Sequence, residues 1–249
     1  MSEGRLIGVG VGPGDPELLT VKAVRVLQAA PVVAYFAKAG RRGNARKIVD
    51  PWLTAANEEL PLAYPVTTEI HFADPAYRAA LAAFYEESAE RIARHLREGR
   101  DVALLSEGDP LFYGSFMHVF MRLKSQFATS IVPGVTGMCG AWGAAGMPMA
   151  WGDDVLVVAP GTLPLADLVE RLGRADGAAI MKIGRHLAKV REALRTCDML
   201  SRAIYVERAT MENEIILPLS EKCDDVAPYF SMVLVPGEGR RPCAGAAFA

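Results

Sequence analysis

Residues 104–114, with the sequence LLSEGDPLFYG, contain the signals from which the fold class follows. Residues 101–105 form a short run of valine and leucine that is typical of a buried parallel strand. Residues 111–124 carry aromatic and leucine side chains at helical spacing, which predicts a helix with one buried face. A polar loop between such elements lies at the carboxyl edge of a sheet, where open α/β folds bind small ligands. A plain turn with a helix cap is the alternative, since Gly, Asp and Pro are ordinary turn residues.

The composition limits the classes of partner. The 249 residues are half apolar and carry a formal net charge of -2, so we expect neither nucleic acid nor an anionic membrane as a partner. The four cysteines include no Cys-x-x-Cys pair, which favours thiols in the reducing cytoplasm. The four histidines have no ligand spacing, so we expect no metal site. The N-terminal residues lack the pattern of a secretory signal.

Residues 125–152 are uncharged and long enough to cross a bilayer. Two prolines and six glycines would leave that backbone poorly satisfied in lipid, so we reject a membrane span. A glycine stands at every third position from Gly134 to Gly146, and each one inside a helix costs up to about 1 kcal/mol relative to alanine. Two explanations stay open: close packing of a second helix, and close approach of a ligand to the backbone.

Strands and helices alternate through the first half. Strand patterns cover residues 5–9, 32–36, 60–64, 101–105 and 128–132, with helices from 20, at 44–53, from 74 to 99 and at 111–124. This predicts a largely parallel sheet. In the second half, strand patterns cover 155–159, 178–183, 203–206, 215–219 and 230–235, with helices at 164–174 and 187–196. Two late strands in succession favour a hairpin and a mixed sheet. We therefore expect two α/β domains, residues 1–132 and 133–249, each around a five-stranded sheet, with the active site in the cleft between them.

The first predicted strand runs into a glycine-rich loop, GVGVGPGDP at residues 8–16. The loop fails as a dinucleotide fingerprint, because the third glycine position is Pro13 when counted from Gly8 and Asp15 when counted from Gly10. A nicotinamide oxidoreductase is therefore disfavoured. The loop is either a tight strand-to-helix crossover or a glycine loop of another kind.

Four ordered motifs together resemble the signatures of the tetrapyrrole methylases, the class III S-adenosylmethionine-dependent methyltransferases. They are the loop at 8–15, GDP at 108–110, VPGVT at 132–136 and ERAT at 207–210. Within the family, LFYGSF at 111–116, MKIGR at 181–185 and YFS at 229–231 look most like the members that methylate carbon 20 of precorrin-2 in cobalamin biosynthesis. Methylation of cobalt-factor II, or of another tetrapyrrole carbon, is the nearest alternative. A non-catalytic sensor of an adenosyl ligand is the alternative from another class.

The resemblance implies S-adenosyl-L-methionine as methyl donor, with S-adenosyl-L-homocysteine as product, and a tetrapyrrole as the small-molecule substrate. It implies cofactor contacts for Glu107, Gly108, Asp109, Tyr113, Thr136, Gly137, Met181, Ala209, Ser231 and Met232. The strand that carries the last two can be aligned in two registers, one residue apart. The glycine loop, with Gly12 and Pro13, is implied to face the tetrapyrrole rather than the cofactor.

Methyl transfer from a sulfonium mainly requires alignment and exclusion of water. A proton must then leave the methylated carbon, and Asp15 is the expected general base, with a turn-capping role as the alternative. The carboxylates of the substrate predict cations around it. We expect Lys38 and Arg46 of the basic run at 38–47, together with Arg185, to bind them, unless the run is a solvated loop. Apolar residues within 113–121, together with the resemblance, predict a homodimer.

Overall fold

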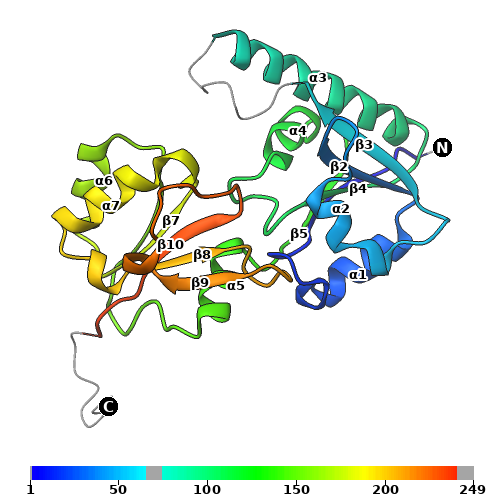
Figure 1. Ribbon diagram of the computed structural model, residues 1–249. Helices are drawn as coiled ribbons and strands as arrows, with labels where there is room; N and C mark the ends of the chain where they lie inside the picture. The colour runs from blue at the N-terminus through cyan, green and yellow to red at the C-terminus, as the bar shows by residue number, and fades with distance from the viewer. Residues whose placement is uncertain (1, 66–74, 240–249) are drawn as a thin grey trace. The chain divides into compact units, whose positions relative to one another are not determined.

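The computed structural model describes residues 2–65 and 75–239, which divide into two units, Met1–Gly137 and Met138–Ala249 (Figure 1). Each unit has a five-stranded sheet with helices, so the predicted α/β class is confirmed. The division falls after Gly137, whereas the sequence placed it after residue 132. Within the described ranges, none of the helices has both the length and the apolar character needed to cross a membrane.

The first sheet is entirely parallel. Its strands are β1 (Leu6–Gly10), β2 (Val32–Lys38), β3 (Glu58–Tyr64), β4 (Val102–Ser106) and β5 (Thr129–Val132), in the order β3-β2-β4-β1-β5. All five strands therefore end at the same edge. Since β4, β1 and β5 are adjacent, the loops that follow them emerge side by side, which is where the first three sequence motifs lie.

Helices cover both faces of this sheet (Figure 1). On one face lie α1 (Val21–Ala29) and α2 (Asn44–Ile48), followed by the short 3-10 helix η2 (Asp50–Trp52); on the other lie α3 (Pro75–Arg97) and α4 (Phe116–Leu123). Thr20, where the sequence places the start of this helix, caps α1 by accepting the Ala23 N–H. The predicted start of α3 at Asp74 lies outside the described residues.

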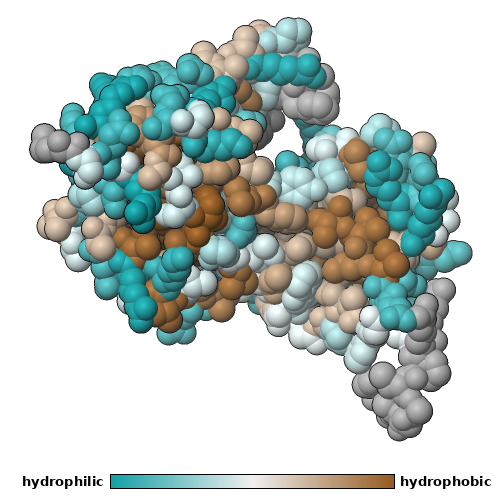
Figure 2. Space-filling view, turned by 180° about the vertical axis from the view of Figure 1, so that it is seen from behind, coloured by the Kyte–Doolittle hydropathy of each residue, from teal (hydrophilic) through white to brown (hydrophobic). Residues whose placement is uncertain are grey.

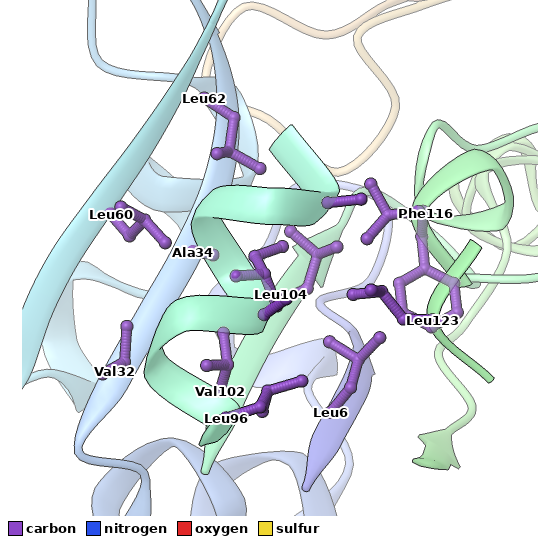
Figure 3. Close-up of a cluster of buried hydrophobic side chains, with 14 of the residues drawn as sticks. Leu6, Val32, Ala34, Leu60, Leu62, Leu96, Val102, Leu104, Phe116 and Leu123 are labelled. Carbon is purple, nitrogen blue, oxygen red and sulfur yellow. The ribbon is translucent and has the colours of Figure 1, made fainter. Parts of the chain in front are cut away.

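Side chains of β4 alternate between the two faces, because successive residues of a strand point in opposite directions. Val102 and Leu104 pack with Phe116 against α3 and α4, as Figure 3 shows. Ala103 and Leu105 pack against α1 and α2. The strand is buried along its whole length, which explains its unbroken apolar sequence.

The helix expected at 111–124 begins only at Phe116. The side chain of Asp109 accepts the Leu111 N–H, and the Asp109 carbonyl accepts the Phe112 N–H, so a turn replaces the first helical residues. Tyr113 then adopts a left-handed φ of 54°, which a continuous helix does not allow. Aromatic spacing predicted the buried face of α4 correctly, but it carried no information on this turn.

The second sheet is mixed, as expected. It contains β6 (Leu156–Pro160), β7 (Gly177–Met181), β8 (Ile204–Glu207), β9 (Ile215–Pro218) and β10 (Ser231–Val235), in the order β6-β7-β10-β8-β9. Only β6 and β7 pair in parallel, and β8 and β9 pair as antiparallel neighbours in sequence. Helices α6 (Leu165–Leu172) and α7 (Leu187–Thr196) cover one face, while α5 (Gly137–Ala145) packs on the other.

The glycines at every third position do not all lie within one helix. Gly134 precedes α5 and packs against the backbone of Gly10 and Gly108. Gly140 is buried within α5, whereas a methyl group on Gly143 would meet open space. Gly146 follows the helix with a φ of 62°, as is common where a helix ends. The surroundings of these glycines therefore differ from one position to the next.

Candidate active site

Backbone hydrogen bonds join the loops after β1 and β4 at the carboxyl edge of the first sheet. Gly108 donates its N–H to the Gly12 carbonyl at 2.8 Å, and Gly12 donates back to the Gly108 carbonyl at 3.4 Å. Both glycines have positive φ, 78° for Gly12 and 65° for Gly108, a conformation that a side chain makes costly. The two glycine motifs of the sequence are thus one structural feature.

The loop after β5 closes on the same point so tightly that side chains are excluded. A Cβ on Gly134 would lie 2.1 Å from the Gly108 carbonyl oxygen and 2.8 Å from the Gly10 Cα. A Cβ on Gly10 would lie 2.5 Å from the Gly134 nitrogen. Because backbone meets backbone at these positions, main-chain amides rather than side chains form this part of the edge.

Asp109 fastens two of these loops together. Its Oδ1 accepts the Leu111 N–H at 2.9 Å, and its Oδ2 accepts the Gly134 N–H at 3.1 Å. A carboxylate that accepts two backbone N–H groups makes charge-assisted hydrogen bonds, which are about twice as strong as neutral ones. The structure shows that Asp109 holds the loops after β4 and β5 together, and its predicted contact with the cofactor stays a prediction.

Strained backbone marks the predicted cofactor positions in both units. Tyr113 has a φ of 54° and a side chain that is 42% exposed. In the second unit, Lys182 (φ 55°), Arg208 (51°) and Thr210 (66°) lie beside the predicted residues Met181 and Ala209. Non-glycine residues rarely adopt positive φ, and such strain gathers at functional sites. Among described residues, Asp198 alone adds a fifth case away from the motifs.

Glu107 turns toward α2. Its Oε1 accepts the Ala45 N–H at 3.1 Å, near the start of that helix. Burial raises the pKa of the Glu107 carboxyl, and the hydrogen bonds from Ala45 and from its own backbone N–H oppose that rise. The structure thus gives the Glu107 carboxylate a partner inside the first unit, and its contact with the cofactor stays a prediction.

The predicted residues of the second unit share one edge of its sheet. Met181 ends β7, Ala209 follows β8, and β10 begins at Ser231 in register with Glu207. Met181, Ala209 and Met232 all face the side that α5 covers. Ser231 is also buried, but its hydroxyl donates to the Pro228 carbonyl at 2.6 Å.

The alternation of β10 bears on its two possible alignments. Met232 belongs with Met181 and Ala209, since all three line the α5 face, whereas Ser231 points to the opposite face. A ligand on the α5 face would therefore meet the side chain of Met232 and only the backbone of Ser231.

A buried carboxylate supports the strained turn after β8, and sequence reasoning did not assign it a role. Glu207 accepts the Tyr205 hydroxyl at 2.6 Å and pairs with Arg208. Burial, together with the hydrogen bond to Glu207, raises the pKa of Tyr205, so its hydroxyl remains a donor. The signal was present in the sequence, since Glu207 opens the ERAT motif, but only the structure shows its partners.

The predicted substrate residues have different surroundings. Lys38 and Arg185 are exposed, and Pro13 is buried in the glycine loop. Arg46 is buried at 5% exposure and pairs with Asp50 and with Glu59. The hydrogen bond to Glu59 is the main cause that raises the pKa of Arg46. Arg46 therefore anchors the basic run, and a direct contact with substrate stays a prediction.

Asp15 caps the 3-10 helix η1 (Pro16–Leu18), accepting the Glu17 N–H at 2.8 Å. This is the turn-capping role that the sequence left open, and the general-base role stays a prediction. Within residues 2–65 and 75–239, no three or more His, Cys, Asp or Glu side chains gather as a metal site would need.

A family model described as tetrapyrrole (corrin/porphyrin) methylases matches residues 5–222. The chain belongs to the tetrapyrrole methylases. It is 57% identical over 239 residues to a Sinorhizobium sp protein named precorrin-2 C(20)-methyltransferase, covering 96% of this chain and 98% of that one. It is 30% identical over 237 residues to the cobalt-precorrin-2 C(20)-methyltransferase of Salmonella typhimurium, covering 93% and 96%.

The same family is represented among solved structures. A uroporphyrin-III C-methyl transferase from Thermus thermophilus, complexed with S-adenyl homocysteine, matches this tetrapyrrole methylase with a TM-score of 0.66 at 26% identity. The match covers 96% of this chain and 99% of that one. The family resemblance carried by the four motifs is therefore confirmed.

Proposed function

We propose that this tetrapyrrole methylase transfers a methyl group from S-adenosyl-L-methionine to carbon 20 of precorrin-2, giving precorrin-3A in cobalamin biosynthesis. The observation that carries the proposal is the 57% identity to the Sinorhizobium precorrin-2 C(20)-methyltransferase over 98% of that protein's length. The glycine-shaped loops of the first unit support it, because they present main-chain atoms where parallel sheets bind small ligands.

S-adenosyl-L-methionine is the proposed donor, and in the first unit we assign its contacts to Gly108, Asp109, Tyr113, Thr136 and Gly137. The geometry fits such a group. A Cβ on Gly108 would lie 3.3 Å from the Gly137 nitrogen, so the absence of a side chain lets the two proposed donor segments lie against each other. The carboxylate of Glu107 remains a candidate contact.

In the second unit we assign the donor's contacts to Met181, Ala209, Ser231 and Met232. Three of these side chains are apolar or small and line the α5 face of the sheet. Apolar side chains of this kind suit the flat face of an adenine ring. Ser231 would contribute through its backbone.

The sulfonium of the bound donor supplies an activated methyl group, so the chain's own residues mainly orient and exclude water. Asp109 and the paired glycines hold the loops in one shape before any ligand arrives. We assign the departing proton to Asp15. Asp15→Asn tests this role, because the amide oxygen still accepts the Glu17 N–H while the base is lost. A large fall in kcat with an unchanged Tm supports the assignment. An unchanged kcat leaves Asp15 only a capping residue.

The carboxylates of precorrin-2 are assigned to the loop at Gly12 and Pro13 and to the cations Lys38, Arg46 and Arg185. Lys38 and Arg185 are exposed and suited to direct ion pairs. Arg46 acts through its ion pairs with Asp50 and Glu59, which hold the basic run in place.

Cobalt-precorrin-2 is the second candidate substrate, because the Salmonella relative that is named for it also matches along nearly its full length. Its 30% identity against 57% for the other relative favours the metal-free macrocycle. A sensor that binds the donor without transferring a methyl group is the candidate from another class.

Incubation with methyl-labelled S-adenosyl-L-methionine and each macrocycle in turn separates these functions. Label incorporated into precorrin-2 supports the proposal. Label incorporated only into the cobalt form supports the second candidate. Donor binding with no incorporation into any macrocycle supports the sensor.

We further propose a homodimer in the cytoplasm. Exposed large hydrophobic side chains support self-association, including Leu111, Tyr113 and Met121 in the first unit and Met147 and Ile215 in the second. Figure 2 shows hydrophobic residues gathered on one face of each unit. Such patches commonly mark interaction surfaces. Sedimentation at micromolar concentration is expected to give twice the mass of 26.8 kDa, and the mass of a single chain would contradict the proposal.

A further inference from the structure

We propose that Glu107 is a positioning residue for the tetrapyrrole, joining the loop after β4 to the basic run at residues 38–47 rather than acting as a ligand of the donor. The inference rests on the proposed function and assigns Glu107 to the positioning of the tetrapyrrole instead of the donor. It starts from the Glu107 Oε1, which accepts the Ala45 N–H at 3.1 Å.

The direction of the Glu107 side chain follows from β4. Along this strand, Ala103 and Leu105 face α1 and α2, and Leu104 faces α3 and α4. Glu107 comes directly after Ser106, the last strand residue, so the same alternation directs it to the side of α2. Its hydrogen bond to Ala45 is thus the continuation of the strand's own geometry.

Helix α2 needs an acceptor from outside. Its N-cap residue is Gly43, and no side chain there caps the helix. A side chain at this position has no space, because a Cβ on Gly43 would lie 2.2 Å from the Phe36 carbonyl oxygen. The first N–H groups of a helix have no partner within it, and a carboxylate is the favoured acceptor at that end. The Glu107 side chain therefore provides the hydrogen-bond acceptor that Gly43 lacks.

Acidic side chains hold two arginines of the basic run. Arg42, just before α2, donates to Asp50 at 2.7 Å, and Arg46, in the last turn of α2, pairs with Asp50 and Glu59. Glu107 binds the start of α2, and these ion pairs join the run to residues that follow the helix. Since Gly108 and Asp109 follow Glu107 directly, one side chain couples the proposed donor loop to the proposed carboxylate-binding segment.

The two roles of Glu107 predict different kinetics. A donor ligand, when lost, weakens the binding of S-adenosyl-L-methionine. A positioning residue, when lost, frees α2 and raises the KM for precorrin-2 while the Kd of the donor stays within about twofold. We expect a rise in KM of about tenfold, which corresponds to about 1.4 kcal/mol.

The test compares Glu107→Ala, Glu107→Gln and the control Glu87→Ala, whose parent side chain is exposed on α3. Three quantities are measured in each: the KM for precorrin-2, the Kd of S-adenosyl-L-methionine by calorimetry, and hydrogen exchange of the Ala45 amide. Glutamine retains an oxygen that accepts the Ala45 N–H, so it is expected to restore all three. Alanine is expected to raise the KM and to speed exchange at Ala45 about tenfold.

A fall in donor affinity with an unchanged KM, or an Ala45 amide that stays protected in Glu107→Ala, would overturn the inference. The exchange measurement separates this result from a failure of the proposed function. If the parent protein methylates no tetrapyrrole, the proposed function is wrong. The link between Glu107 and α2 is still supported if the Ala45 amide exchanges fast in Glu107→Ala and as slowly as in the parent in Glu107→Gln.

Discussion

Removing the Asp109 carboxylate should uncouple two loops of the first unit and weaken donor binding. In Asp109→Ala, the N–H groups of Leu111 and Gly134 both lose their acceptor. Hydrogen bonds to charged groups contribute ~1.5–3 kcal/mol each. Because Asp109 is only half-buried, water replaces part of that, and we expect a total loss of about 2–3 kcal/mol.

If the loops must be reordered on binding, this loss appears in the donor affinity. The Kd of S-adenosyl-L-methionine is then expected to rise by about 30- to 140-fold, since 1.4 kcal/mol corresponds to a factor of ten. In Asp109→Asn the amide nitrogen cannot accept, so one hydrogen bond survives and an intermediate Kd is expected. Calorimetric titration of the three proteins measures the series.

Asp101→Ala is a matched control at the opposite edge of the same sheet. Asp101 also accepts a backbone N–H, that of Arg5 at 2.7 Å, but at the amino ends of the strands. Its loss should lower the Tm by a few degrees and leave the donor affinity unchanged. An Asp109→Ala protein that binds the donor as tightly as the parent, or an Asp101→Ala protein that loses affinity equally, would refute the reasoning.

Three further predictions concern glycines and Glu107. Gly134→Ala is expected to lower the Tm and abolish donor binding, because its Cβ would lie 2.1 Å from the Gly108 carbonyl oxygen. Gly143→Ala lies in open space within α5 and should stabilise the protein by up to ~1 kcal/mol. Equal melting temperatures of the two variants would count against the close packing at Gly134. Gly137→Ala, at the first position of α5, should melt no lower than the parent but bind the donor and transfer methyl more weakly; a lower Tm with intact affinity would assign this glycine to packing instead. Because burial raises the pKa of Glu107, the folded state holds its proton to higher pH than the unfolded chain, and its contribution to stability falls as pH rises above about 4. Glu107→Gln should therefore gain stability relative to the parent as pH rises, in denaturant titrations at several pH values; a difference independent of pH would contradict this.

Periodicity predicted the elements well, because burial dictates it directly. The continuous apolar run at β4 reflects burial on both faces of the sheet, and the helical spacing of Phe116 and Leu123 reflects burial of one face of α4. The delayed start of α4 was missed because the turn depends on where the Asp109 side chain points. The Gly134–Gly146 series does not lie within one helix, because α5 begins at Gly137 and ends at Ala145, and the spacing alone did not show where the helix begins and ends.

The candidate site could likewise be predicted only in part from the sequence. The glycine motifs were visible in the sequence, but the pairing of Gly12 with Gly108 depends on strand order, which no local pattern gives. The acceptor for the α2 amide is Glu107, 62 residues away in sequence, and only the fold brings the two together. The same residue types bind ligands and hold loops in place, so the two roles can be told apart only when the partners of each side chain are known.

Transfer of a ¹³C-labelled methyl group from S-adenosyl-L-methionine to precorrin-2, followed by NMR of the isolated product, tests the proposed activity at the level of a single carbon. The label is expected at carbon 20, giving precorrin-3A, and the same preparation of Asp109→Ala should yield the same product more slowly. Label at any other carbon, or none on precorrin-2 while the protein still binds the donor, would contradict the proposed function.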